Sequence, residues 1–178
     1  MKFSETKLKG CYVLEPEIFK DNRGYFFESF NQSKFETAIG KPINFVQDIQ
    51  SFSNKGVLRG LHFQKGEHAQ AKLVRALRGK VLDVVVDLRK DSKTYGEHYS
   101  VELSADNKKQ LFVPRGFAHG FVVLSETAIF SYKCDNFYNK DAEGGIRYDD
   151  PLLNIDWGIP EKNIVVSQKD LELNNLRL

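Results

Sequence analysis

The sequence predicts a mainly β domain, a sandwich or barrel with the jelly roll among the natural candidates. Short strand-like runs recur at roughly 8–12 residue spacing, and turn signals such as Asp21-Asn22-Arg23-Gly24 and Pro114-Arg115-Gly116 separate them. Helical segments are scarce. The 178 residues suffice for one domain with its own core, and no repeat, low-complexity stretch or linker divides them. We therefore expect a single domain over residues 1–178.

In the first half of the chain, strand-like runs cover residues 11–14, 24–30, 45–52, 57–63 and 71–77. One helix interrupts them at residues 32–39. Asn31 or Ser33 can cap its start, and Gly40 followed by Pro42 ends it.

In the second half, the clearest strand covers residues 80–88. It alternates strictly, with Leu82, Val84, Val86 and Leu88 on one face and Val81, Asp83, Val85 and Asp87 on the other. The carboxylates of Asp83 and Asp87 can thus belong to a solvated strand face. Further strand-like runs lie at 98–103, 110–113, 117–124 and 127–133, and a second short helix is expected at 169–175.

Composition excludes several classes of protein. The 26 Lys and Arg residues nearly balance the 24 Asp and Glu, and no long block of like charge offers a site for nucleic acid or anionic lipid. Cys11 and Cys134 lack the spacing of a redox or zinc motif, which is typical of reduced thiols in a cytosol. Neither a signal peptide nor a run of ~18 apolar residues is present. We expect a cytoplasmic protein that binds neither nucleic acid nor membrane.

One predicted strand carries two side chains suited to chemistry, Arg59 and His62. Histidine ionises near neutral pH, so His62 is the first candidate for a base, although a histidine held by a neighbour in the core is the alternative. Arg59 and Lys72 lie on neighbouring predicted strands, where buried cations are costly unless they meet an anion. Strict alternation places Arg59 and His62 on opposite faces, so a shared pocket requires a bulge or kink, and Gly60 is the residue suited to it.

The segment Pro114-Arg115-Gly116-Phe117-Ala118-His119 has the spacing P-x-G-x-x-H. It resembles the second motif of the cupins, in which a turn brings a histidine into the mouth of a small β-barrel. Metal-binding cupins also carry an H-x-H pair and a downstream Glu in their first motif, whereas His62 stands alone here. A bound metal is therefore disfavoured, and side chains alone must perform any chemistry.

Strand periodicity gives no reason to assign a catalytic role to the two remaining candidates, Tyr132 and Asp170. Tyr132 shares a strand face with Ala128 and Phe130 and can be a core aromatic residue. Asp170 can be a helix cap or a solvated charge.

Together, the motifs resemble those of the dTDP-4-dehydrorhamnose 3,5-epimerase family. They follow in order along almost the whole chain: DNRGYFFE at 21–28, FVQD at 45–48, SFS at 51–53, GVLRGLHFQ at 56–64, QAKLV at 70–74, GKVLDVVVDLR at 79–89, FVPRGFAHGF at 112–121 and YDDP at 148–151 ahead of Trp157. The resemblance implies a metal-free cupin, a double-stranded β-helix or jelly roll with a few short helices, which works as a homodimer.

The family's reaction converts dTDP-4-dehydro-6-deoxy-D-glucose to dTDP-4-dehydro-L-rhamnose, a step toward rhamnose in cell-surface polysaccharides. The C4 ketone acidifies the protons at C3 and C5, so the site needs a base, an acid opposite it and a cation for the enolate oxygen. The resemblance implies that His62 is the base, Tyr132 the acid and Lys72 the residue near the C4 oxygen, with no cofactor. Asp170 matches the carboxylate that orients the histidine, and Asp83 is a second candidate.

The resemblance also implies the substrate-binding residues. Arg23 and Arg59 match the diphosphate contacts, with Lys169 a further candidate, and Tyr138 matches a residue that stacks on thymine. Contacts to the sugar or nucleotide fall on Phe26, Glu28, Gln47, His119 and Glu143. An N-terminal strand exchanged between subunits would carry some contacts across a dimer interface. Two positions depart from the family: Ile49 replaces a common Asn, and Gln168 a common basic residue.

Three alternatives stay open. The closest keeps the fold and inverts only C3 or C5, or isomerises the ketone. A metal-dependent cupin oxygenase would need the H-x-H pair that is missing. A non-catalytic sugar-binding cupin or structural dimer would have no use for His62 together with Tyr132.

Overall fold

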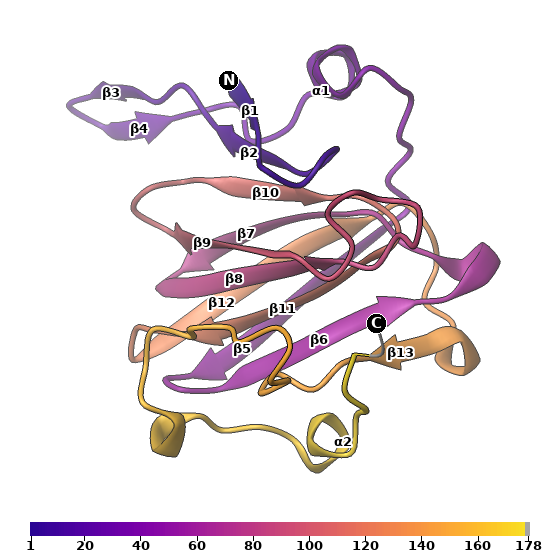
Figure 1. The fold of residues 1–178 in the computed structure, drawn as a ribbon. Helices are drawn as coiled ribbons and strands as arrows, with labels where there is room; N and C mark the ends of the chain where they lie inside the picture. Colours follow the sequence, from indigo (N-terminus) through magenta and orange to yellow (C-terminus); the bar gives the residue numbers. More distant parts are fainter. Residues whose placement is uncertain (177–178) are drawn as a thin grey trace.

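A computed structural model describes residues 1–176 and shows two antiparallel sheets packed against each other (Figure 1). In spatial order, the first sheet contains β1 (Lys2–Glu5), β2 (Tyr12–Glu15), β10 (Gln110–Val113), β7 (Lys72–Arg78), β12 (Thr127–Cys134) and β5 (Gln47–Asn54). The second contains β13 (Glu143–Gly145), β6 (Leu58–Gln64), β11 (Phe117–Val123), β8 (Lys80–Asp87) and β9 (His98–Ser104). The predicted jelly roll is confirmed.

The remaining elements are short. A hairpin of β3 (Phe19–Asp21) and β4 (Gly24–Phe26) stands apart from both sheets. The helices are α1 (Gln32–Ile39) and α2 (Gln168–Leu171), with single 3₁₀ turns at Gly66–His68, Lys140–Ala142 and Glu161–Asn163. Within residues 1–176, none of the helices is long and apolar enough to cross a membrane.

The expected elements differ from the structure mainly at short segments. The strands β1, β3 and β13 were not predicted, the run 24–30 is a strand only over Gly24–Phe26, and the second helix ends at Leu171. Strands of three or four residues carry too little alternation to be recognised, because their partners in the sheet define them. Helix α1 matches its prediction: the Asn31 side chain accepts a hydrogen bond from the Lys34 N–H, and Gly40 ends the helix with φ +77°.

Three apolar clusters hold the two sheets together and attach the remaining segments to them. One fills the space between the sheets and includes Val85, Val74 and Phe130. A second lies on the outer face of the β6–β11–β8 sheet, where the segment 146–176 covers it with Trp157 and other side chains. The third packs Phe35 of α1 against the first sheet. The C-terminal segment is thereby placed beside β6, with α2 against that strand (Figure 1).

A bulge in β6 changes which side chains point inward. In the pairing of β6 with β11, His62 lies opposite His119 and Arg59 opposite Phe121, so three residues of β6 span two of β11. Gly60 has φ +128°, and a Cβ atom there would lie 2.5 Å from the Gly120 Cα atom. Arg59 and His62 therefore share the inner face, as the sequence prediction required.

The two aspartates of β8 do not lie on a solvated face. Both Asp83 and Asp87 are 0% exposed and point between the sheets. Their alternation with Leu82, Val84 and Val86 was predicted correctly, but the solvated-face alternative is wrong because the opposite sheet covers this side.

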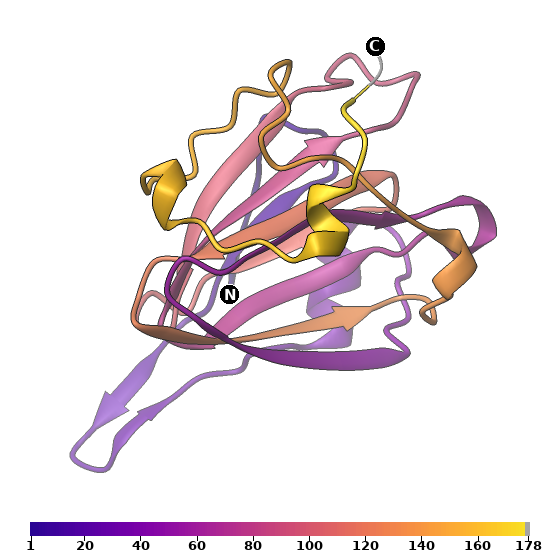
Figure 2. The same ribbon diagram turned by 90° about the horizontal axis from the view of Figure 1, so that it is seen from below.

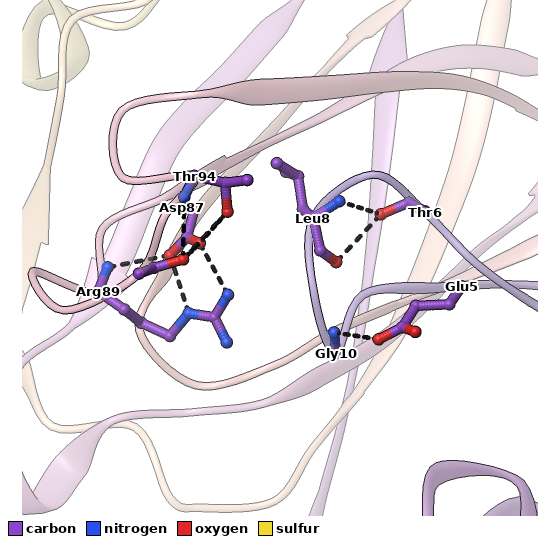
Figure 3. A network of polar contacts seen from close by, with 8 residues as sticks. Glu5, Thr6, Leu8, Gly10, Asp87, Arg89 and Thr94 are labelled. Atoms are coloured by element: carbon purple, nitrogen blue, oxygen red, sulfur yellow. Dashed lines mark hydrogen bonds and ion pairs between the residues drawn. The ribbon is translucent and has the colours of Figure 1, made fainter.

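Asp87 is held by a local network (Figure 3). Its carboxylate accepts hydrogen bonds from Arg89 Nε at 2.9 Å, Ser92 Oγ at 2.6 Å and Thr94 Oγ1 at 2.7 Å. Burial by itself raises the pKa of Asp87, but the hydrogen bonds outweigh it and lower the pKa from 3.8 to about 2. The carboxylate therefore stays ionised in the folded protein down to lower pH than in the unfolded chain.

We expect Asp87→Asn to lower the free energy of unfolding by about 2 kcal/mol at pH 7. Because the folded pKa is depressed, wild-type Asp87 contributes its stability above the unfolded pKa near 3.8 and loses it as the pH falls toward about 2. Urea unfolding at pH 7 and at pH 3 measures this. The difference in the free energy of unfolding between wild type and variant should be smaller at pH 3 than at pH 7. An equal difference at both pH values would contradict the lowered pKa of Asp87.

The β3–β4 hairpin extends away from the sheets (Figure 2). It carries three exposed aromatic side chains, Phe19, Tyr25 and Phe26, the last 70% exposed. An arm of this kind leaves a large apolar surface without cover in the single chain.

Candidate active site

A cavity of about 630 Å³ opens between the two sheets. Its walls come from β5, β6, β7, β11, β12 and the C-terminal segment, and it is lined by Ile49, Ser51, Val57, Leu58, Arg59, His62, Lys72, His119, Phe121, Tyr132, Val165, Val166, Ser167, Lys169 and Asp170. Polar and ionisable groups as far apart in the sequence as Ser51 and Asp170 thus meet inside one mainly apolar pocket.

His62 is paired with Asp170. The Asp170 Oδ1 atom lies 2.7 Å from His62 Nε2, while Oδ2 accepts a hydrogen bond from the Gly60 N–H at 3.2 Å. Burial is the largest single influence and acts to raise the pKa of Asp170. The hydrogen bonds from His62, Gly60 and Ser167 and the charge of His62 together outweigh it, so the pKa lies below its ordinary value. The ionised carboxylate orients the imidazole and stabilises its protonated form.

Local structure explains why Asp170 reaches this position. Ser167 caps the start of α2 by accepting a hydrogen bond from the Asp170 N–H at 3.1 Å. This short helix packs on β6, and Asp170 is buried there with 3% exposure. The partner that the resemblance implied for His62 is therefore in place. The second candidate for that position, Asp83, was wrong, because its hydrogen bonds go to His119.

Tyr132 and Lys72 line the cavity from the other sheet. Tyr132 is on β12 and Lys72 on β7, whereas His62 is on β6. The Lys72 ammonium lies 5.8 Å from the centroid of the Tyr132 ring. Burial raises the pKa of Tyr132 and lowers that of Lys72. The phenol is thus a neutral proton donor at physiological pH, and it faces the histidine from the opposite sheet.

The cavity also holds Arg59 and His119. Arg59 Nε donates to the buried Ser53 Oγ at 3.1 Å, and the terminal nitrogens of its guanidinium make no hydrogen bond to a residue in the described part of the chain. His119 Nε2 lies 2.9 Å from Asp83 Oδ2. Arg59 thereby presents free donors that suit an anionic group.

A smaller cavity of about 100 Å³ adjoins the first and shares Ile49, His62, Lys72 and Tyr132 with it. Tyr138 and Glu143 line its far side. The Glu143 carboxylate accepts hydrogen bonds from Tyr138 Oη at 2.9 Å and Lys169 Nζ at 2.6 Å. The Gln47 side chain accepts one from the Tyr138 N–H at 3.2 Å. Four further residues predicted for the site, Gln47, Tyr138, Glu143 and Lys169, thus form one connected group beside it.

Three predicted residues lie elsewhere in the chain. Arg23 and Phe26 are on the β3–β4 hairpin, which lines its own cavity of about 440 Å³, and Arg23 is paired with Asp21. Glu28 follows the hairpin and contacts Lys34 at 2.9 Å. A single chain therefore does not bring these side chains to the histidine.

Several lining residues were not predicted. Ser51, Phe121, Val165, Val166 and Ser167 border the cavity, and Ser53 holds Arg59. For Ser51 and Ser53, the signal lies in the alternation of β5, in which Ile49, Ser51 and Ser53 point inward. The segment 165–167 lacks such a signal because it is irregular and reaches the cavity only through the packing of the C-terminal segment. Within residues 1–176, no cluster of three or more His, Cys, Asp or Glu side chains has the geometry to hold a metal ion.

This arrangement suits proton transfer at a carbon atom. A carboxylate-bound histidine and a neutral phenol lie on different sheets, and a lysine ammonium lies next to the phenol. Such a site can remove a proton from one face of a carbon next to a carbonyl group, stabilise the enolate and return a proton to the other face.

Comparison with known proteins agrees with this chemistry. The family model described as dTDP-4-dehydrorhamnose 3,5-epimerase matches residues 5–177. The chain is 50% identical over 177 residues to the dTDP-4-dehydrorhamnose 3,5-epimerase of Escherichia coli (strain K12), covering 99% of this chain and 95% of that protein.

Solved structures extend the similarity to three dimensions. The crystal structure of dTDP-4-dehydrorhamnose 3,5-epimerase from Elizabethkingia anophelis NUHP1 is 59% identical with a TM-score of 0.96, covering 98% of this chain and 96% of that one. The dTDP-6-deoxy-D-glucose-3,5-epimerase of Legionella pneumophila Philadelphia 1, solved in complex with dTDP-4-keto-L-rhamnose, is 45% identical with a TM-score of 0.93, covering 98% and 92%. The chain belongs to the dTDP-4-dehydrorhamnose 3,5-epimerase family.

Proposed function

We propose that this enzyme inverts C3 and C5 of dTDP-4-dehydro-6-deoxy-D-glucose and forms dTDP-4-dehydro-L-rhamnose, in the biosynthesis of dTDP-L-rhamnose. The observation that carries the proposal is the His62–Asp170 pair, with a 2.7 Å contact, on the opposite sheet from Tyr132 and Lys72 in one cavity. The cavity of about 630 Å³ is large enough for a nucleotide-linked sugar.

The reaction needs only proton transfers. His62 takes the proton from the carbon next to the C4 ketone, and the C–H electron pair moves into the enolate whose oxygen lies near the Lys72 ammonium. Tyr132 then donates its phenolic proton to the opposite face of that carbon, and the enolate returns to the ketone. Repetition at the second carbon gives double inversion. Solvent restores the protonation states of His62 and Tyr132, so the overall reaction is redox-neutral.

Arg59 supports recognition of the diphosphate. Its guanidinium lines the cavity, and the Ser53 hydroxyl holds its Nε atom at 3.1 Å. We expect Arg59→Ala to weaken dTDP binding by about 10- to 100-fold with a smaller effect on kcat, because charge-assisted hydrogen bonds are each worth about 1.5–3 kcal/mol. Isothermal titration with dTDP measures this. Arg78→Ala, on β7 of the other sheet and outside the cavity, is the control. An unchanged dTDP affinity in Arg59→Ala would exclude the diphosphate role.

The arm residues Arg23, Phe26 and Glu28 fit the proposal if the enzyme is a homodimer that exchanges its N-terminal hairpin. Two features support this: the exposed aromatic residues of the hairpin, and the exposed Phe52 and Leu77 on the outer face of the first sheet. A second copy of the chain would cover both and bring the hairpin of one subunit to the cavity of the other.

Mixing two impaired variants, assayed at a substrate concentration far below KM so that weakened binding lowers turnover, tests this exchange. Arg23→Ala removes the arm residue and His62→Ala removes the base, so a mixed dimer carries one intact site when the arm crosses to its partner. We expect random subunit exchange to restore roughly a quarter of wild-type turnover. Mixtures that stay as inactive as the separate variants after exchange, which native mass spectrometry verifies, would contradict arm exchange.

Proton NMR tests the reaction itself. Chelator-treated enzyme is incubated with dTDP-4-dehydro-6-deoxy-D-glucose in deuterated buffer, and the product is trapped by the reductase that consumes it. Deuterium at C3 and C5 with L-rhamno configuration is expected. Exchange at one carbon would identify a mono-epimerase, and the absence of exchange would overturn the proposal.

We propose a cytoplasmic location for the enzyme. Cys11 and Cys134 are buried free thiols, and burial raises their pKa values to about 12 and about 11. Such thiols suit a reducing compartment, where the nucleotide sugars of this pathway would be made.

A further inference from the structure

Asp83 is a fully buried carboxylate whose hydrogen bonds lead to the cavity. It is 0% exposed, and its Oδ1 and Oδ2 atoms lie 3.1 and 2.9 Å from His119 Nε2. No other residue in the range 1–176 hydrogen-bonds to this side chain. Burial raises the pKa of Asp83, and the His119 hydrogen bond and the charges of His119 and Lys72 oppose this shift. An ionised carboxylate only accepts hydrogen bonds, so in that state of Asp83 the proton between the two side chains lies on His119 Nε2.

His119 is held firmly on its other sides. Its ring stacks on Phe130 with centroids 6.2 Å apart and an interplanar angle of 22°, and the residue is only 7% exposed. The ring borders the cavity that contains His62, Lys72 and Tyr132. Its second nitrogen, Nδ1, makes no hydrogen bond to any residue that the structure describes. A ring fixed at Nε2 therefore has Nδ1 left for a bound molecule.

We propose that Asp83 is a positioning residue for the epimerase reaction: it fixes His119 with Nε2–H toward the carboxylate and leaves Nδ1 to contact the ketosugar. This inference rests on the proposed function and deepens it. It also explains why a carboxylate lies deep between the sheets, where an isolated buried charge is costly and is tolerated only when it is paired.

The second buried aspartate of β8 supplies a contrast. Asp87 points to the same side of the strand, is also 0% exposed, and is held by Arg89, Ser92 and Thr94 in a loop that does not line the cavity. Asp87 stabilises its own loop, whereas the hydrogen-bond partner of Asp83 borders the substrate cavity. Asp87→Asn is therefore a matched control for Asp83→Asn, with the same chemical change on the same strand.

Turnover and dTDP binding are measured first on the wild-type enzyme. If the wild type does not exchange the C3 and C5 protons of the ketosugar, the proposed function is rejected, and the role of Asp83 is not the cause. With an active wild type, we expect Asp83→Asn to lower kcat by about 10- to 100-fold, as for other residues that orient a functional histidine. Its dTDP affinity should change less than about twofold, since dTDP lacks the sugar. Asp87→Asn should lose stability while its kcat stays within about twofold of wild type.

A double-mutant cycle separates positioning from a general structural role. If Asp83 acts through His119, adding Asp83→Asn to a His119→Gln enzyme should lower kcat by less than about a further twofold. An equal loss of kcat in both backgrounds, or a parallel loss of dTDP binding in Asp83→Asn, would overturn the proposal.

Nitrogen-15 NMR of the wild-type enzyme tests the assignment even if Asp83→Asn does not fold. The chain has 4 histidines, so comparison with His119→Gln identifies the signal of interest. We expect a proton on Nε2 of His119 at neutral pH. A neutral ring protonated only at Nδ1 would contradict the role of Asp83.

Discussion

His62→Ala is expected to lower kcat by about 10³-fold or more and to abolish the exchange of solvent deuterium into C3 and C5, because it removes the base. The imidazole is held by Asp170 at 2.7 Å and lies in the cavity, so no other group takes over its position. Proton NMR in deuterated buffer follows both carbons separately. Unchanged exchange at either carbon would exclude His62 as the base for that carbon.

A second histidine provides the control for this variant. His98 lies on β9, outside the cavity, and His98→Ala removes an imidazole of the same size. Its turnover should equal that of the wild type within about twofold, since it touches no reacting group. Retained dTDP affinity in His62→Ala would show that the nucleotide part of the site is intact.

Tyr132→Phe is expected to lower the rate of double inversion by about 10²-fold, the usual contribution of a general acid. Phenylalanine keeps the ring beside Phe130, whose centroid lies 6.3 Å away, and removes only the hydroxyl group. Burial raises the pKa of Tyr132, so the wild-type phenol is protonated and can donate at neutral pH. Loss of this donor should impair inversion more than the first deprotonation by His62.

The measurement is the ratio of deuterium incorporation to epimerised product. In Tyr132→Phe, the substrate should exchange its proton and return largely without inversion, or stop after one inversion. Tyr99→Phe, on β9 outside the cavity, is the control for losing a phenol. Normal double inversion in Tyr132→Phe would exclude the acid role.

The pattern of residues along the chain predicts the architecture because local rules decide most of it. Period-two alternation in residues 80–88 and the caps around residues 32–39 act within a few residues, and both elements occur as expected. The short strands β1, β3 and β13 lack this local signal because neighbouring strands define them. The bulge at Gly60 was expected from the need to turn Arg59 and His62 to one side.

Family motifs predict which side chains belong to the site, but not how they are paired. The pairing of His62 with Asp170 spans 108 residues, and it depends on α2 packing against β6. Asp83 was the other candidate, and alternation along its strand does not decide between His62 and His119 as its partner. Register between β8 and β11 decides it, because it brings His119 within 2.9 Å of Asp83.

By itself, the sequence determined the β architecture and the family, because alternation, turn residues and motifs depend on neighbouring positions. The family motifs also predict which side chains react. Only the tertiary structure decided that Asp83 and Asp87 are buried. It also decided the hydrogen-bonded pairs, Asp170 with His62 and Asp83 with His119. Finally, it showed that Arg23, Phe26 and Glu28 lie away from the cavity of their own chain. The physical reason is that contacts between distant segments depend on strand register and sheet packing, which no local pattern encodes.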